Sequence, residues 1–316
     1  MTASNVAADV YLYGMTVVST LHRVAASLSA GGGYVEIAES HICPGGEAMN
    51  AAMLLAALGV RCAVGGPHWG RDTREVLERY AERYGIDARA VTRDDDYAGL
   101  CDCVLVHGQE RTVLGRFARY FAERPRRWDE ADAHAVERAR VVAIDPFFAD
   151  SSERAAALAA RAAKPYVTID CDYASALHAN AAVTVVSREF RRRRYVAVHD
   201  LDLFGAYAAR ASGLTVFTSG PEPILFGRKY QVVQSFEPFS VPVLSTLGAG
   251  DTFRAGMVFG VLHGLDDAAC IRFAAGLAAL LCTRFPIADN APSLTEVEQF
   301  LTGAAQRPAY EGTSRK

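Results

Sequence analysis

The stretch Leu244–Gly260, which reads LSTLGAGDTFRAGMVFG, indicates the fold and the chemistry of the chain more strongly than any other segment. A turn made of Gly248, Ala249 and Gly250 lets the backbone approach an anion closely and leads Asp251 into a predicted helix. The free N–H groups in the first turn of a helix favour negative charge. A carboxylate in the same place can accept a proton. The segment therefore combines an anion cradle with a base, which suits transfer of a phosphoryl group to a hydroxyl.

Two further segments place glycines beside polar side chains. In Pro44–Asn50 (PGGEAMN), two glycines precede Asn50, whose side chain can both donate and accept hydrogen bonds. A helix N-cap explains Asn50 equally well. The stretch Thr218–Gly220 follows a predicted strand and can set a hydroxyl and bare backbone beside a nucleotide. An ordinary turn at a strand end is the simpler explanation when that stretch is considered alone.

The pattern of apolar runs predicts an α/β fold. From residue 141 onward, strands and helices alternate, which predicts a parallel sheet with helices on both faces. Such sheets bind ligands at the carboxyl ends of their strands, where Asp145, Ser187 and Thr218 fall. The predicted strands are Val10–Val18, Tyr34–Ile42, Val60–Val64, Leu100–Val106, Arg111–Leu114, Val141–Ile144, Tyr166–Ile169, Val183–Val186 and Leu214–Thr218, and the predicted helices are Asn50–Leu58, Thr73–Tyr84, Ser152–Ala163 and Ala268–Thr283.

Composition restricts the class of protein. Of 316 residues, 51% are hydrophobic, which suffices for one large α/β domain or two smaller ones. A net charge of −3 argues against a nucleic-acid partner, and no apolar run is long enough to span a membrane. No secretory signal is evident and the seven cysteines form no CxxC pair, so we expect free thiols in the cytoplasm. We expect no metal at Cys101 and Cys103, and a solvated face for the arginine run 191–194.

In their order and spacing, these segments resemble the ribokinase (PfkB) family of carbohydrate and nucleoside kinases across residues 8–302. The matching signatures are Gly45-Gly46-x-x-x-Asn50 and Gly248-Ala249-Gly250-Asp251-Thr252-Phe253, a wording shared with ketohexokinases and several bacterial sugar kinases. The resemblance implies a ribokinase-like, doubly wound, mostly parallel sheet with helices on both faces. It also implies a small β-sheet lid from residues 20–42 and 97–121, within one domain over residues 1–303. A flexible tail at 304–316 and a homodimer formed through the lid complete this expectation.

The resemblance also implies roles for individual residues. Asp251 is the expected base that deprotonates the acceptor hydroxyl, and the amides of Gly248, Ala249 and Gly250 are expected to stabilise the transferring phosphoryl group. Asp145 fits a substrate contact and a structural hydrogen bond equally well. Mg²⁺ is expected to bridge the ATP phosphates. Sugar binding is expected at Gly45, Gly46 and Asn50, and nucleotide binding at Ser187, Thr218, Gly220 and Thr246.

Four positions depart from the family pattern. Ser19 stands where the family usually has a sugar-binding Asp, so we expect a weaker sugar contact there. Ser245 stands where an acid near a monovalent-cation site is usual, which leaves activation by potassium open. Ser187 replaces the Asn of an Asn-x-x-Glu motif, with Glu189 one place off, and Glu47 replaces a Lys of ribokinases proper.

We therefore expect an ATP-dependent sugar kinase that phosphorylates a hydroxyl of a monosaccharide or close analogue. A nucleoside kinase of the same family is the alternative, with Phe117, Tyr120 and Phe121 available to contact a base. A non-catalytic sugar or nucleotide sensor is the third hypothesis. The departures at Ser19 and Ser245 favour a sensor, whereas the intact base position argues against one.

Overall fold

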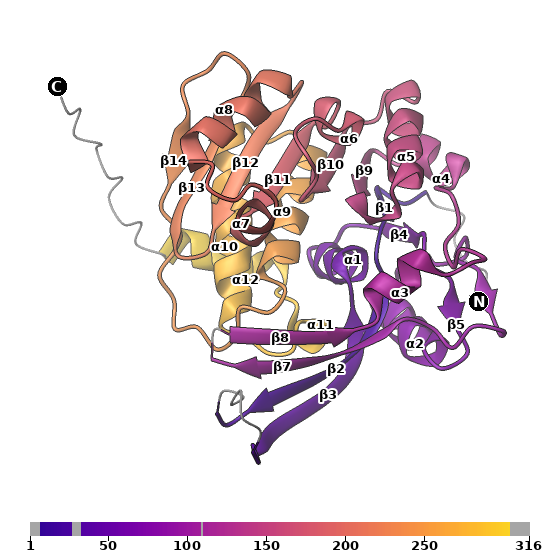
Figure 1. Cartoon of the computed structure of the whole chain (residues 1–316). Helices are drawn as coiled ribbons and strands as arrows, with labels where there is room; N and C mark the ends of the chain where they lie inside the picture. Colours follow the sequence, from indigo (N-terminus) through magenta and orange to yellow (C-terminus); the bar gives the residue numbers. More distant parts are fainter. Residues whose placement is uncertain (1–6, 27–32, 109, 304–316) are drawn as a thin grey trace.

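Eight strands form the larger sheet of the computed structural model, which describes residues 7–26, 33–108 and 110–303 (Figure 1). Their order is β14-β13-β12-β11-β10-β9-β1-β4, and the pairs from β12 to β4 are parallel. β13 and β14 extend the β12 edge in antiparallel fashion. These strands are β1 (Val10–Tyr13), β4 (Cys62–Gly65), β9 (Val141–Ile144), β10 (Tyr166–Ile169), β11 (Val183–Ser187), β12 (Leu214–Ser219), β13 (Glu222–Gly227) and β14 (Gln234–Phe236).

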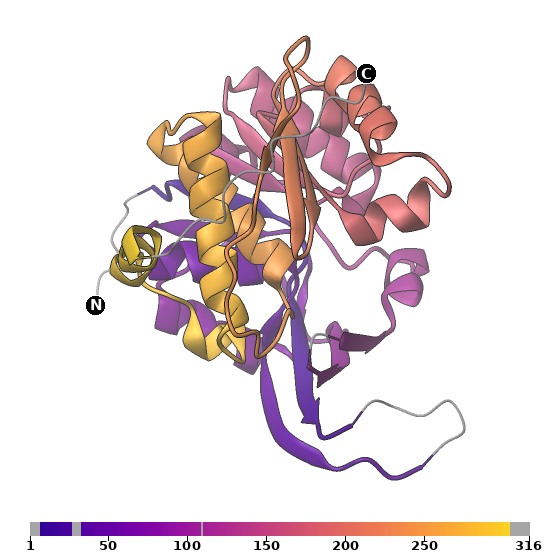
Figure 2. The ribbon, with the colours of Figure 1, turned by 90° about the vertical axis from the view of Figure 1, so that its left-hand side faces the viewer.

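Helices cover both faces of this sheet, as the alternation predicts. Along β1, Val10 and Leu12 join one buried cluster and Tyr11 and Tyr13 join another, because successive strand residues point to opposite faces. In Figure 2 the orange and yellow helices lie on one side and the pink to salmon helices on the other. The orange and yellow helices are α9 (Ala249–His263), α10 (Asp267–Cys282), α11 (Ile287–Asn290) and α12 (Leu294–Gly303), and the purple α1 (Glu47–Ala57) packs on the same face. The helices of the other face are α4 (Ala133–Arg138), α5 (Asp150–Arg161), α6 (Ala176–Ala179), α7 (Arg188–Arg194) and α8 (Asp200–Arg210).

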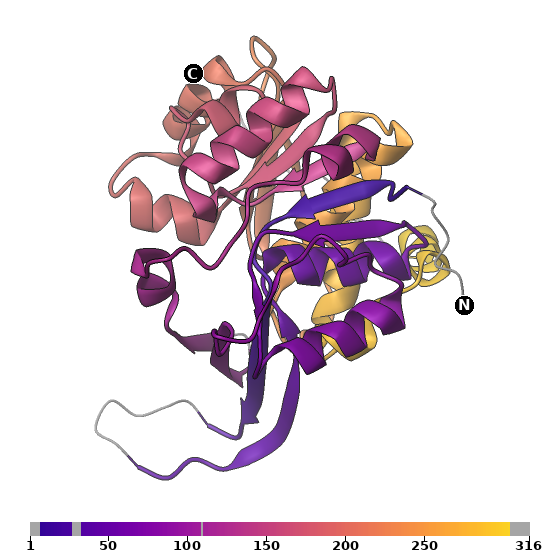
Figure 3. The same ribbon diagram turned by 90° about the vertical axis from the view of Figure 1, so that its right-hand side faces the viewer.

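A separate four-stranded sheet, the small sheet, projects from the body of the molecule (Figures 2 and 3). Its order is β3-β2-β7-β8, with β2 and β7 parallel and the outer pairs antiparallel. The strands predicted at Leu100–Val106 and Arg111–Leu114 are confirmed as β7 and β8, which pair in antiparallel fashion. The remaining elements are β2 (Val17–Val24), β3 (Ile37–Gly45), β5 (Trp69–Gly70), α2 (Arg74–Tyr84), β6 (Arg93–Asp94), β7 (Cys101–His107), β8 (Glu110–Gly115), α3 (Phe117–Ala122) and a 3₁₀ turn at Pro146–Phe148. The expected tail at 304–316 lies outside the described residues.

The prediction of one strand over Val10–Val18 is wrong. The chain leaves the large sheet after β1 and enters the small sheet at β2. At the junction, a Cβ on Gly14 would lie 2.0 Å from an oxygen of Asp145, so only glycine fits. The Met15 amide donates to the same carboxylate at 2.7 Å, which ties the junction to the end of β9. This break directs β2 away from the large sheet.

The helix predicted at Asn50–Leu58 begins three residues earlier, at Glu47. Gly46 is its N-cap with φ 86°, a conformation that favours glycine, and a Cβ there would lie 2.5 Å from the Met15 carbonyl. That carbonyl accepts the amides of Ala48 and Met49 at 3.1 and 3.3 Å. The N-cap explanation for Asn50 is therefore wrong, and its side chain is available for a contact across the molecule.

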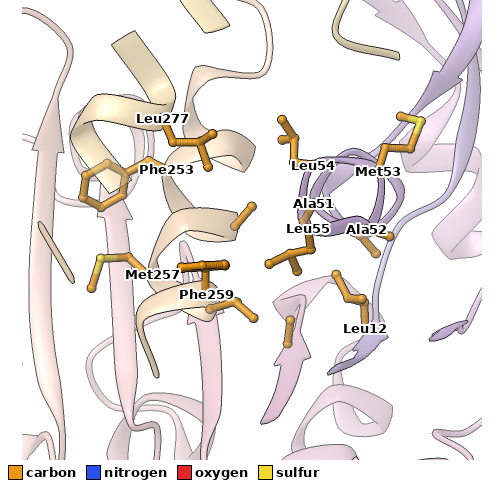
Figure 4. Close-up of a cluster of buried hydrophobic side chains, with 14 of the residues drawn as sticks. Leu12, Ala51, Ala52, Met53, Leu54, Leu55, Phe253, Met257, Phe259 and Leu277 are labelled. Atoms are coloured by element: carbon orange, nitrogen blue, oxygen red, sulfur yellow. The ribbon is translucent and has the colours of Figure 1, made fainter. Parts of the chain in front are cut away.

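The core beneath the site is formed by α1, α9 and α10. Figure 4 shows Leu54 and Leu55 of α1 on the side of that helix that faces α9 and α10, and both are fully buried. Close packing of this kind fixes the relative position of the two helix N-termini. Within the described residues, none of the helices has the length and apolar character needed to cross a membrane.

Candidate active site

A cavity of about 1630 Å³ lies where the carboxyl ends of the large sheet meet the small sheet. It receives residues from β2, β3, β7 and β8, from the starts of α1, α7 and α9, and from the ends of β10, β11 and β12. Asp145 is the predicted site residue that does not line it. The predicted residues that do are Ser19, Gly45, Gly46, Asn50, Ser187, Thr218, Gly220, Thr246, Gly248, Ala249, Gly250 and Asp251.

The turn before α9 presents backbone to this cavity. Gly248 is the N-cap with φ 72°, and a Cβ there would lie 1.9 Å from Ile287. The Ala249 amide is used within the turn, because it donates to the Thr246 carbonyl at 3.2 Å. The first intrahelical bond runs from the Thr252 amide to the Gly248 carbonyl. The amides of Gly250 and Asp251 precede that bond, so they have no acceptor within the helix.

Asn50 and Asp251 meet across the cavity wall, although 201 residues separate them. The Asn50 amide nitrogen donates to Oδ2 of Asp251 at 2.8 Å. Burial raises the pKa of Asp251, while the Asn50 hydrogen bond and the positive charge of Arg254 act in the opposite direction. Asn50 of α1 thus holds the Asp251 carboxylate at the N-terminus of α9. At the preceding residue, Gly250, the space that a side chain would occupy is open.

Asp145 has a structural position. It forms an ion pair with Arg254 in which both side chains are fully buried, and it accepts the Met15 amide at 2.7 Å. Arg254 lies one helical turn after Asp251 on α9. The pair therefore connects the end of β9, the β1–β2 junction and the helix that carries Asp251. Asp145 was predicted to contact the substrate or to form a structural hydrogen bond, and its observed contacts are structural.

The opposite end of the cavity is formed by β11, β12 and α7. Ser187 caps α7 by accepting the Phe190 amide at 3.1 Å, and Gly220 has φ 66° directly after β12. The arginine run is not a uniformly solvated face: Arg191 is 3% exposed and donates to the carbonyls of Val186 and Thr218. The prediction is wrong for Arg191, because its guanidinium is buried against the carboxyl ends of β11 and β12. The cationic side chains that line the cavity are Arg188, Arg193 and Arg194 from α7 and Arg111 from β8.

Several charged residues that line the cavity were absent from the predicted site, among them Asp170, Arg111, Asp102 and Glu47. Asp170 follows β10 with φ 47° and accepts the Ser187 amide and hydroxyl at 2.7 and 2.8 Å. The rule that ligands sit at strand ends would have found it. Arg111 crosses from the small sheet to Glu189 on α7 at 2.8 Å. Asp102 and Glu47 also line the cavity, and no local pattern indicates them.

Glu47 lies close to the other acids of the site. Burial raises its pKa well above the ordinary value, and the nearby charges of Asp251 and Asp145 raise it further. Ser245, at the position of the missing cation-site acid, uses its hydroxyl to accept the Leu247 amide at 3.1 Å. Among the described residues, no group of three or more His, Cys, Asp or Glu side chains is arranged to hold a metal ion.

The chain is similar to known kinases over most of its length. A profile of the pfkB family of carbohydrate kinases matches residues 8–293. The 5-dehydro-2-deoxygluconokinase of Shouchella clausii is 25% identical over 284 residues, 80% of this chain and 85% of that protein. A nucleoside kinase of Methanothermobacter thermautotrophicus is 27% identical over 283 residues, 82% of this chain and 84% of that protein.

The fold is likewise that of a solved kinase. The structure of Arabidopsis thaliana ribokinase, complexed with ribose and ATP, gives a TM-score of 0.75 at 18% identity and covers 93% of this chain and 99% of the plant protein. The predicted α/β class, with its additional small sheet, is therefore confirmed. The chain belongs to the pfkB family of carbohydrate kinases and is a sugar or nucleoside kinase of that family.

Proposed function

We propose that this kinase transfers the γ-phosphoryl group of ATP to a hydroxyl of a monosaccharide or close analogue, with Asp251 as the general base. The observation that carries the proposal is the Asn50–Asp251 hydrogen bond at the cavity wall. This bond joins Asp251, in the first turn of α9, to the start of α1, which follows Gly45 and Gly46. A hydroxyl bound between these elements lies within reach of a base.

The proton chemistry follows from the position of Asp251. Sugar hydroxyls are weak nucleophiles at neutral pH. As the hydroxyl oxygen attacks the γ-phosphorus, its proton passes to the Asp251 carboxylate, and the bond to the leaving ADP oxygen breaks. The raised pKa of Asp251 makes it a stronger base than an exposed aspartate.

The phosphates of ATP would be bound by backbone amides and arginines. The amides of Gly250 and Asp251, at the positive end of α9, suit the charge that develops on the transferring group. Ser187, Thr218 and Gly220 border the region in which a nucleotide would lie, together with the α7 arginines. These groups fit a nucleotide bound as its Mg²⁺ complex, and the ion neutralises phosphate charge when bound.

The acceptor would be bound by four residues that line the cavity together with Asp251: Ser19, Gly45, Gly46 and Asn50. Both glycines are required by the protein itself, because a Cβ would lie 2.3 Å from the Ser19 hydroxyl oxygen at Gly45 and 2.5 Å from the Met15 carbonyl oxygen at Gly46. Asn50 can donate a second amide hydrogen to a hydroxyl while it holds Asp251. The small sheet, which supplies Ser19, would then act as a lid over the acceptor.

A nucleoside acceptor is the second candidate function. Phe117 and Phe121 line the cavity, where they could stack on a base. Tyr120, which also motivated this alternative, is 2% exposed and donates its hydroxyl hydrogen to the Arg127 carbonyl. It therefore supports the core beneath the two phenylalanines.

A panel of neutral sugars, sugar acids and nucleosides with Mg-ATP, followed by ADP release, tests the proposal. We expect turnover with at least one sugar and identification of a sugar phosphate as product. Turnover with nucleosides alone would establish the alternative. Thermal stabilisation by sugars without ADP release would contradict catalysis and support a sensor.

We also propose a homodimer formed through the small sheet. β3 and β8 are its edge strands, and Ile42 and Leu114 on them are 58% and 54% exposed. Open edges with apolar side chains favour association. Light scattering of the purified protein should give twice the 34.0 kDa chain mass, and a monomer would contradict this proposal.

A further inference from the structure

Asp102 of β7 faces the cavity from the middle of the small sheet. It pairs in register with Ser19 of the neighbouring strand β2, and both line the cavity. Val104, two residues further along β7, lines it as well, whereas Cys103 between them does not. This alternation indicates that Asp102 presents its carboxylate to the ligand space.

One oxygen of this carboxylate has no partner. Oδ1 of Asp102 is shielded from solvent and accepts no hydrogen bond in the described structure. The neighbouring Ser19 side chain lowers the pKa of Asp102, but the larger effect of burial raises it above its ordinary value. A buried, unsatisfied carboxylate oxygen is destabilising for the protein alone. A ligand with a hydrogen-bond donor can instead reach the part of Asp102 that lines the cavity.

The wall around Asp102 restricts the ligand further. Ser19 is 5% exposed and its hydroxyl oxygen would lie 2.3 Å from a Cβ on Gly45, so Ser19, Gly45 and Asp102 form one continuous surface. Glu47 and Asp251 line the same cavity. A carboxylate accepts hydrogen bonds and repels other anions. The arginines of the cavity come instead from α7 and from β8, where Arg111 is paired with Glu189.

We infer that Asp102 is an acceptor-binding residue whose carboxylate, at the cavity surface, receives a hydrogen bond from a hydroxyl of a neutral polyhydroxy compound, and that it disfavours acceptors bearing a carboxylate or phosphate nearby. The inference rests on the proposed sugar-kinase function and adds the charge class of the acceptor. Ser19 lies opposite Asp102 on the neighbouring strand, so the two residues form a cross-strand pair on the wall of the cavity.

The test compares Asp102→Asn and Asp102→Leu with wild type, using the neutral sugar that gives the highest turnover in the panel. Losing a hydrogen bond to a charged acceptor should raise the KM for that sugar by about 10- to 100-fold, with the KM for ATP unchanged. The ratio of activity on a sugar acid to activity on the neutral sugar should rise. Cys103→Ala, on the other face of the same strand, is the control and should leave both KM values unchanged.

The thermal midpoint of each variant distinguishes weaker sugar binding from a failure to fold. Asp102→Leu removes a buried unpaired oxygen, so its thermal midpoint should equal or exceed that of wild type even though sugar binding is weakened. An unchanged sugar KM in both Asp102 variants would overturn the inference while leaving the kinase function intact. If wild type turns over no sugar, the proposed function fails by itself. Thermal stabilisation by the same sugars then gives the readout for Asp102: its loss in Asp102→Asn supports the inference, and its retention overturns it.

Discussion

Replacing Arg254 by methionine should destabilise the protein by about 3–5 kcal/mol, because it breaks a fully buried ion pair and leaves the Asp145 carboxylate without its counter-charge. Methionine fills much of the space of the arginine stem, so cavity formation contributes little. The Asp145 carboxylate would keep the Met15 amide as a hydrogen-bond donor at 2.7 Å. A carboxyl group can also become neutral by binding a proton, which limits the cost.

Removing the other partner should cost more. In Asp145→Asn the guanidinium of Arg254 stays charged, because arginine does not lose its proton in proteins. Its Nε and Nη2 already lack hydrogen-bond partners in the described structure. We therefore expect a loss at the upper end of the same range, about 5 kcal/mol, for Asp145→Asn. Asp145→Asn should therefore lose more stability than Arg254→Met, because an unpaired carboxylate can become neutral and an unpaired guanidinium cannot.

Urea unfolding at pH 7, followed by far-ultraviolet circular dichroism, measures both free energies. The control is Arg89→Met, which removes an ion pair with Asp87 at the surface, where the Arg89 side chain is 64% exposed. Its unfolding midpoint should match that of wild type. The reasoning is refuted if Arg254→Met and Asp145→Asn both stay within about 1 kcal/mol of wild type, below the range expected for a broken buried pair, or if Arg254→Met is the more costly change.

Two further predictions concern protons in the site. Glu47→Gln should stabilise the protein, because the folded-state pKa of Glu47 is raised: wild-type stability falls as pH rises from 4.5 to that pKa and is constant above it. Thermal midpoints across pH should show a gain that is absent below pH 4.5 and grows above it, and an equal gain at all pH values would contradict this cause. Asn50→Ala removes a hydrogen bond that lowers the pKa of Asp251, so the acid limb of the kcat/KM profile should move to higher pH. An unmoved acid limb would show that another group controls it.

The elements with local signals were predicted well. The helix predicted over Thr73–Tyr84 is confirmed as α2, and Gly85 ends it in the left-handed conformation. The alternation from Val141 onward gives the parallel sheet because each strand is a short buried run followed by a helix. Gly248 begins α9 because a left-handed N-cap beside Ile287 excludes any side chain.

The features that were missed depend on distant partners. The apolar run after Val10 looks continuous, and its break appears only when Asp145 occupies the space beside Gly14. The partners of Asp102 and Arg254 are set by strand register and by helix packing, respectively. A pattern along one segment contains neither kind of information. Hence the glycine turn before α9 could be identified from sequence, whereas the charged residues that line the cavity beside it could not.

The Asn50–Asp251 contact makes Asp251→Asn the variant that tests the proposed mechanism most directly. The substitution preserves the shape of the side chain and removes its capacity to accept a proton. With the best sugar of the panel, kcat should fall by about 10²- to 10⁴-fold, while ATP affinity and the thermal midpoint stay close to those of wild type. A variant that retains near wild-type kcat would contradict the assignment of Asp251 as the base.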